Sequence, residues 1–249
     1  MRSDLPSLAP DWALFLDIDG TLIDFAPRPD LVQVPAELRM NLVTLRSALD
    51  GAVALVSGRA STVIDMLFAP DRFQVAGQHG AELRLDDEQV RLPRNPHLAP
   101  IAAALAAFAH AHDGLVFEDK GDSIALHYRL APELEGEVEW LAGKLVAAAG
   151  PEFQLLSSHM AVDIKQRSAT KGSAILWFMA RPPFAGRIPV FFGDDRTDED
   201  GFAAVNAWGG YSVHVGARED SIARFRLQSP ADVRQWLRRQ AGAYAPETA

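Results

Sequence analysis

Short apolar runs alternate with amphipathic stretches over the first 82 residues. Residues 13–16 (Ala-Leu-Phe-Leu) and 52–56 (Ala-Val-Ala-Leu-Val) are wholly apolar, which is typical of strands buried on both faces of a parallel sheet. Between them, four leucines at helical spacing predict a helix over residues 36–49: Leu38, Leu42, Leu45 and Leu49. We expect a further helix at 61–67 and a short strand at 73–76. This βαβ order predicts a doubly wound α/β sheet.

Residues 88–166 have a different pattern, in which apolar and polar positions alternate along the predicted strands. Ile124, Leu126 and Tyr128 alternate with polar or small neighbours, and so do Met160, Val162 and Ile164. Such alternation is typical of an antiparallel sheet with one solvated face. The elements expected here are a helix at 98–111, strands at 115–118 and 122–129, a helix at 132–149, and strands at 153–157 and 159–165. The pattern predicts a small α+β domain of order αββαββ.

The α/β pattern resumes at Lys171. Helices are expected at 171–180, 198–206 and 231–240, and strands at 188–192 and 211–215. The predicted fold class is therefore α/β: a Rossmann-like, doubly wound parallel-sheet core with an inserted α+β cap domain. The predicted boundaries are 1–87 for the first part of the core, 88–166 for the cap and 167–249 for the second part of the core.

Composition narrows the classes of partner and cofactor. The chain has 249 residues, with 33 acidic and 24 basic side chains and a formal net charge of −9. This acid excess argues against nucleic acid or an anionic membrane as a partner, although local cations can still bind an anionic substrate. Cysteine is absent, so any metal must use oxygen or imidazole ligands, and acidic oxygen sites suit Mg²⁺. No signal peptide or membrane span is predicted, and we expect a soluble, cytoplasmic protein.

Asp17 and Asp19 directly follow the first predicted strand, in the segment Asp-Ile-Asp-Gly-Thr-Leu. Two carboxylates at i and i+2 after a strand can point the same way, toward the sheet edge at which parallel α/β folds bind ligands. One carboxylate can attack phosphorus as a nucleophile, and the other can protonate a leaving group and then activate water. On its own, the same pattern is more typical of an acidic turn.

Three further polar motifs follow predicted strands or begin a predicted helix. The segment 194–200 holds five acids in seven residues after an apolar run, which suits a hard cation or, alternatively, a solvated loop that caps a helix. Asp194, nearest the strand, is the better candidate ligand. Ser57-Gly58-Arg59 precedes a helix and can cradle an oxyanion or act as an ordinary cap. Lys171 can neutralise a phosphate or simply lie on the surface.

The order of these motifs is more specific than any one of them. Two acids, then Ser57, Lys171 and the acidic segment resemble the haloacid dehalogenase superfamily of phosphatases, and the insertion resembles its larger cap type. Residues 77–82 (Gly-Gln-His-Gly-Ala-Glu) and 118–129 (Glu-Asp-Lys-Gly-Asp-Ser-Ile-Ala-Leu-His-Tyr-Arg) resemble segments of trehalose-6-phosphate phosphatases in particular. The resemblance extends over about residues 13–216. It departs at Asp163-Ile164-Lys165-Gln166, where that family usually has Glu-x-Lys-Pro.

The resemblance implies a role for each motif. Asp17 would be the nucleophile that becomes phospho-aspartate, and Asp19 the general acid and then the base. Ser57 and Lys171 would bind phosphoryl oxygens. Mg²⁺ would be held by Asp17, the backbone carbonyl of Asp19 and Asp194, with Asp195 or Asp198 in support. The candidate substrate-binding residues are Gly20, Thr21, Gly58, Arg59, His79, Gly80, Glu82, Glu118, Lys120, His127 and Arg129.

The implied activity is Mg²⁺-dependent hydrolysis of trehalose 6-phosphate to trehalose and phosphate, the last step of trehalose biosynthesis. It implies a small sugar-phosphate substrate and a functional link to a trehalose-6-phosphate synthase. The alternative is a phosphatase of the same superfamily for another sugar phosphate, such as sucrose phosphate or mannosyl-phosphoglycerate. An aspartyl-phosphate receiver domain fits less well, because such domains are shorter and have no use for Asp19 or for a cap.

Overall fold

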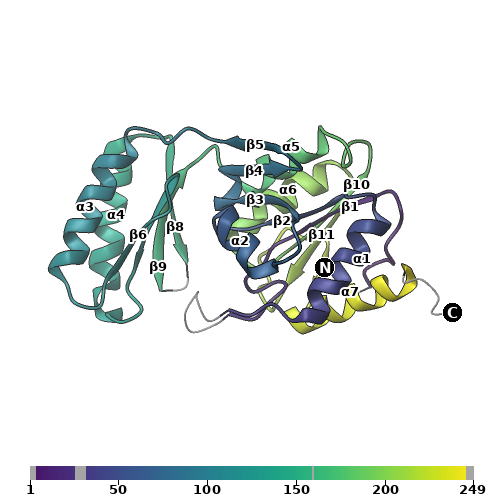
Figure 1. Cartoon of the computed structure of the whole chain (residues 1–249). Helices are drawn as coiled ribbons and strands as arrows, with labels where there is room; N and C mark the ends of the chain where they lie inside the picture. The colour runs from purple at the N-terminus through teal and green to yellow at the C-terminus, as the bar shows by residue number, and fades with distance from the viewer. Residues whose placement is uncertain (1–3, 26–31, 159, 245–249) are drawn as a thin grey trace. The chain divides into compact units, whose positions relative to one another are not determined.

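The computed structural model describes residues 4–25, 32–158 and 160–244 (Figure 1). The chain forms two compact units. One comprises the residues up to Val90 together with those from Thr170 onward, and the other is Arg91–Ala169. The predicted strand at 159–165 starts at His159, which lies outside the described residues.

The first unit is built on an eight-stranded sheet. Its strands lie in the order β12 (Phe225–Leu227), β11 (Tyr211–Val215), β10 (Ile188–Gly193), β1 (Trp12–Leu16), β2 (Val53–Val56), β3 (Gln74–Gly77), β4 (Glu82–Leu85) and β5 (Glu88–Arg91). From β12 to β3 the pairs are parallel, and β4 runs antiparallel to β3. The apolar runs predicted as buried strands form the central strands β1, β2 and β10, which confirms the predicted parallel α/β core.

Helices cover both faces of this sheet, which is why its central strands carry no polar face. They are α1 (Ala36–Ala48), α2 (Ser61–Phe68), α5 (Lys171–Met179), α6 (Glu199–Ala207) and α7 (Pro230–Tyr244). Helix α1 packs against α7 and α5 against α6, with the first pair in front of the sheet and the second behind it in Figure 1. Phe15 of β1 contacts Phe178 and Phe184, with ring centroids 6.0 and 5.3 Å away.

Three strands of this sheet were not expected from the sequence. Strands β4 and β5 extend the sheet beyond β3, and β12 forms its other edge. Both edge strands are short, and β5 carries mostly exposed polar residues, so neither has the apolar run on which the other predictions rest.

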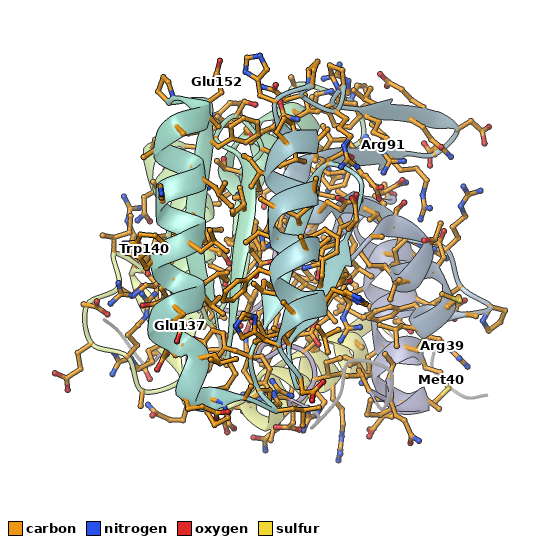
Figure 2. The ribbon with its side chains drawn as sticks, turned by 90° about the vertical axis from the view of Figure 1, so that its left-hand side faces the viewer. Arg39, Met40, Arg91, Glu137, Trp140 and Glu152 are labelled. Atoms are coloured by element: carbon orange, nitrogen blue, oxygen red, sulfur yellow. The ribbon has the colours of Figure 1, made fainter. Side chains whose placement is uncertain are left out.

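The second unit has the predicted order of elements, α3 (Leu98–Ala111), β6 (Val116–Asp119), β7 (Ser123–His127), α4 (Glu135–Ala149), β8 (Phe153–Ser158) and β9 (Ala161–Gln166). Its strands form an antiparallel sheet in the order β6-β7-β9-β8. Ile124, Leu126, Val162 and Ile164 are buried in one core, together with apolar residues of α3 and α4. Figure 2 shows these two helices side by side, with Trp140 on the outward side of α4. Among the described residues, every helix is too short or too polar to cross a bilayer.

Candidate active site

Three polar segments begin at one edge of the core sheet. Leu16, the last residue of β1, is in register with Phe192 of β10 and Leu55 of β2. The chain therefore leaves these parallel strands side by side, with Asp17 after β1, Ser57 after β2 and Asp194 after β10. As expected from the motif order, the central carboxyl edge of the sheet collects the candidate catalytic groups.

Lys171 connects two of these segments through its ammonium group. Its Nζ donates a hydrogen bond to Oδ1 of Asp17 at 2.7 Å and another to Oδ1 of Asp198 at 2.6 Å. All three side chains are buried. The lysine is the first residue of α5, which begins with a capping box formed by Thr170 and Ser173. This cap fixes the start of the helix and thereby places the ammonium against Asp17.

The electrostatics of this cluster show a shortage of positive charge. Burial raises the pKa of Asp17 well above its usual range; Lys171 lowers it, and the charges of Asp198 and Asp194 raise it further. Burial and the charge of Asp198 likewise raise the pKa of Asp194 to about 7, against the opposing effect of Lys171. Burial lowers the pKa of Lys171, but Asp17 and Asp198 outweigh it, so that the lysine stays protonated. One ammonium does not balance three crowded carboxylates.

These three carboxylates form a group that fits a metal ion. Asp17, Asp194 and Asp198 each offer an oxygen, and these oxygens all lie within 4.8 Å of one another. The hydroxyl of buried Thr21 connects two of these acids: it donates to Oδ1 of Asp194 at 3.0 Å and lies 3.4 Å from Oδ2 of Asp17. Gly20, with φ +81°, packs against Asp194, and a Cβ added to this glycine would collide with the Asp194 carboxylate. The donor set is all oxygen, as hard divalent cations prefer.

Asp198 and Asp195 occupy different positions in the acidic loop. Asp198 is fully buried, and its second oxygen accepts from the backbone N–H groups of Asp194 and Asp195 at 3.0 and 2.9 Å. The structure thus places Asp198 inside the cluster and uses it to shape the loop around Asp194. Asp195 is exposed and accepts from the N–H of Arg196 at 2.7 Å, so it caps the following turn outside the three-acid group.

Asp19 lies beside this group and is held by Arg59. The guanidinium donates to both carboxylate oxygens, from Nε at 2.6 Å and from Nη2 at 2.7 Å. Arg59 also donates its backbone N–H to Oγ of Ser57 at 3.2 Å. Arg59 is a candidate substrate-binding residue, and the structure shows that it joins Asp19 to Ser57.

The segment 77–82 packs against the Ser57 loop. The backbone N–H groups of Gln78 and His79 donate to the carbonyls of Arg59 and Ser57, each at 2.9 Å. The carboxylate of Glu82 accepts from the backbone N–H of Ser61 at 2.7 Å. The sequence indicated substrate contacts for His79, Gly80 and Glu82, and the structure shows how they are attached to the core.

Comparison with known proteins identifies the family. The family model for trehalose-phosphatase matches residues 15–231. The chain belongs to the trehalose-phosphatase family. It is 41% identical over 237 residues to the trehalose-6-phosphate phosphatase of Escherichia coli, covering 94% of this chain and 88% of that protein. It is 44% identical over 207 residues to a probable trehalose-phosphate phosphatase of Sinorhizobium fredii, covering 83% and 78%.

Solved structures agree with this fold. The C-terminal domain of a C. albicans trehalose-6-phosphate phosphatase has a TM-score of 0.81 at 20% identity, covering 94% of this chain and 93% of that one. A phosphatase of the haloalkanoate dehalogenase superfamily from Bacteroides thetaiotaomicron has a TM-score of 0.63 at 17% identity, covering 93% and 95%. These likenesses confirm the predicted fold class.

The remaining candidate residues belong to the second unit, where Glu118, Lys120 and His127 lie close together at strands β6 and β7. Oε2 of Glu118 accepts from Nε2 of His127 at 3.0 Å and lies 3.8 Å from Nζ of Lys120. The Lys120 ammonium donates to Oδ1 of Asp163 at 2.9 Å. Asp163 stands where the family usually has glutamate, and it still offers a carboxylate to Lys120. Arg129 is exposed and lies two residues beyond the end of β7.

Two features of the first unit were missed by the sequence reasoning. A cavity of about 310 Å³ borders the acidic cluster, with Asp24, Asp194, His214 and Arg218 in its lining. His214 is fully buried in β11, and within the described part of the chain neither ring nitrogen has a hydrogen-bond partner. The sequence signals this residue only as one histidine between two valines at the end of a predicted strand, a pattern that indicates the strand and no function.

Proposed function

We propose that this protein hydrolyses trehalose 6-phosphate to trehalose and inorganic phosphate. The observation that carries the proposal is the contact between the Lys171 ammonium and the Asp17 carboxylate at the sheet edge, with Asp194 beside them. That arrangement suits phosphoryl transfer, because it sets a carboxylate nucleophile next to cations that a phosphate requires. The substrate is inferred from the two bacterial relatives, whose names refer to trehalose phosphate.

In the first chemical step, a carboxylate oxygen of Asp17 attacks phosphorus. The bond from phosphorus to the C6 oxygen of trehalose breaks, and Asp19 donates a proton to the departing oxygen. In the second step Asp19 takes a proton from water, the water oxygen attacks phosphorus, and the bond to Asp17 breaks to release phosphate. Lys171 and Ser57 hold the phosphoryl oxygens in both steps.

A divalent cation, which we infer to be Mg²⁺, fits the oxygens of Asp17 and Asp194. The crowding that raises the pKa of both acids is the physical reason that a cation is expected there. When bound, it supplies positive charge next to the phosphoryl group. We assign Asp198 to support of the site and leave Asp195 outside it, because Asp198 alone of the two is buried in the cluster.

Recognition of the sugar is assigned to the second unit. Glu118, Lys120 and His127 form a connected set of donors and acceptors, which is what hydroxyl recognition requires. The names of the two bacterial relatives support trehalose 6-phosphate, rather than another sugar phosphate, as the substrate. The substrate must be formed by a glycosyl-transfer reaction, so we infer a functional link to a trehalose-6-phosphate synthase.

The test is a panel of sugar phosphates, with phosphate release measured with and without Mg²⁺. We expect trehalose 6-phosphate to be turned over far faster than sucrose 6-phosphate or glucose 6-phosphate, and only with the metal. Asp17→Asn should abolish turnover, whereas Asp11→Asn, at the opposite end of β1, should not. Equal turnover of all sugar phosphates would contradict the assigned substrate, and full activity of Asp17→Asn would contradict the mechanism.

A further inference from the structure

The chain makes an unusual left-handed turn after β3. Gln78, His79 and Gly80 have φ values of 48°, 56° and 102° in succession, and the first two are not glycine. Residues other than glycine adopt this region at a cost, and they persist there only where the surroundings hold them. Strand β3 and the antiparallel strand β4 enclose the turn, with Gly77 opposite Glu82.

Glu82 is the side chain that holds this turn from within. Its Oε1 accepts from Nε2 of Gln78 at 2.9 Å, and its Oε2 accepts from the backbone N–H of Ser61 at 2.7 Å. Ser61 is the first residue of α2, whose N-cap, Ala60, has no side chain that can cap it. One carboxylate therefore caps the helix that follows the Ser57 loop and fastens the buried amide of Gln78.

The turn is in contact with both proposed phosphate-binding segments. On one side the His79 ring lies against Gly58, where a Cβ would be only 2.6 Å from Nε2 of the histidine. On the other side Gly80 lies against Thr170, the N-cap of α5. A Cβ added to Gly80 would be only 2.5 Å from the carbonyl oxygen of Thr170. Lys171 follows Thr170 directly. The turn thus occupies the space between the Ser57 loop and the start of α5.

We propose that Glu82 is a positioning residue, which sets the spacing between Ser57 and Lys171 by holding the Gln78–Gly80 turn. This rests on the proposed function, in which those two residues bind the phosphoryl group. Displacement of either binding group by even 1 Å can lower the rate by a large factor. Because Ser57 and Lys171 bind the phosphoryl group, loss of Glu82 should affect every phosphate substrate alike and leave sugar recognition unchanged.

The test is a double-mutant cycle of Glu82→Gln with Ser57→Ala. In Glu82→Gln one carboxylate oxygen becomes an NH₂ group, which cannot accept a hydrogen bond. Either the Gln78 amide or the Ser61 backbone N–H then loses its acceptor. We expect kcat/KM for trehalose 6-phosphate and for p-nitrophenyl phosphate to fall by the same factor, roughly 10- to 100-fold. In the Ser57→Ala background the same substitution should cost less than about threefold, because its effect passes through Ser57. Equal losses in both backgrounds would overturn the proposal.

Asp65→Asn is the matched control. Asp65 of α2 forms a bidentate ion pair with Arg84 of β4, at 2.6 Å for both bonds, and so joins the same two elements away from the turn. We expect this variant to lose thermal stability and keep its kcat/KM. An equal loss of kcat/KM in Asp65→Asn would assign the Glu82 effect to stability and overturn the positioning role.

The two proposals fail in distinguishable ways. If trehalose 6-phosphate is not hydrolysed, the same four proteins of the cycle are compared by their turnover of p-nitrophenyl phosphate. Calorimetry also measures the affinity of each for inorganic phosphate, which Glu82→Gln should weaken only when Ser57 is present. An unchanged phosphate affinity in Glu82→Gln would overturn the positioning role whatever the substrate.

Discussion

Arg59 holds both carboxylate oxygens of Asp19, at 2.6 and 2.7 Å. Only the planar fork of an arginine can form such a pair, so the guanidinium sets the orientation of the carboxylate as well as its charge environment. The backbone of the same arginine contacts the hydroxyl of Ser57. One residue therefore joins the proposed acid–base group to the proposed phosphate-binding loop.

Arg59→Lys should lower kcat by roughly 10- to 100-fold, because the ammonium keeps the charge but loses the bidentate geometry. The loss should be larger for trehalose 6-phosphate than for p-nitrophenyl phosphate, because a sugar alkoxide needs the proton from Asp19 to leave, whereas nitrophenolate leaves readily without it. Steady-state kinetics measure the loss. Arg196→Lys is the control, because the Arg196 guanidinium is exposed and its ion pair with Asp220 is long, at 3.8 Å. Wild-type kcat in Arg59→Lys would show that orientation of Asp19 by the fork is unimportant.

The central strands could be predicted because parallel strands covered on both faces must be apolar throughout. Strands β1, β2 and β10 each show such a run, and the chemistry follows directly at their ends. Strand β12 has only three residues, and β5 is exposed, so neither leaves a pattern distinct from a loop. The hairpin of β3 and β4 also depends on the left-handed turn at Gln78 and His79, which residue type does not indicate.

The same distinction holds for the site. The convergence of Asp17, Lys171 and Asp194 follows from strand order, because parallel strands end at one edge. The partners of Arg59 and Glu82 depend on side-chain direction after a turn, and no spacing rule reports this. Both are candidate substrate contacts, and the structure adds that one is paired with Asp19 and the other with Ser61.

Mg²⁺ should raise the thermal stability of the protein. Three carboxylates crowd one ammonium, and a bound cation relieves this repulsion in the folded state alone. At saturating metal we expect Tm to rise by about 5–10 °C. Differential scanning fluorimetry with increasing MgCl₂, at constant ionic strength, measures the shift.

Variants of the two adjacent acids separate the metal site from the acidic loop. In Asp194→Asn the Mg²⁺-dependent shift should disappear, because this carboxylate belongs to the cluster. In Asp195→Asn it should persist, since Asp195 caps the following turn and asparagine caps equally well. A lost shift in Asp195→Asn with a normal shift in Asp194→Asn would reverse the assignment.

His214 should make the fold sensitive to mild acid. Burial lowers the pKa of this imidazole, and Arg218 and Arg226 lower it further, against the opposing charges of Glu199 and Asp198. Below its ordinary value of 6.5 the unfolded chain therefore binds a proton that the folded chain excludes. The stabilising contribution is complete above pH 6.5 and is lost as pH falls toward the lowered folded value, by up to about 1.4 kcal/mol per pH unit.

Urea unfolding at several pH values from 7.5 to 5 measures this dependence. His214→Gln should flatten the slope below pH 6.5, because glutamine does not titrate. His110→Gln, at an exposed position of α3, should leave the slope as it is. An unchanged slope in His214→Gln would assign the acid sensitivity to other groups.

Glu118→Gln should separate sugar recognition from phosphoryl transfer. The carboxylate accepts a hydrogen bond from His127 and lies near the Lys120 ammonium, and it would accept hydrogen bonds from sugar hydroxyls as well. With the neutral amide we expect KM for trehalose 6-phosphate to rise by roughly tenfold, since a charged hydrogen bond is worth about 1.5–3 kcal/mol. Turnover of p-nitrophenyl phosphate should stay at the wild-type level, because it carries no sugar.

The matched control for Glu118 is its neighbour Asp119. It points to the other side of β6, where Arg94 donates two hydrogen bonds to it, each 2.9 Å long. Asp119→Asn removes a carboxylate from the same strand and should leave both substrates unaffected. If Glu118→Gln lowered turnover of the two substrates equally, Glu118 would support the fold or the chemistry and the sugar contact would have to be sought elsewhere on the sheet. A selective loss in Glu118→Gln alone therefore assigns specificity to the polar face that carries Glu118, Lys120 and His127.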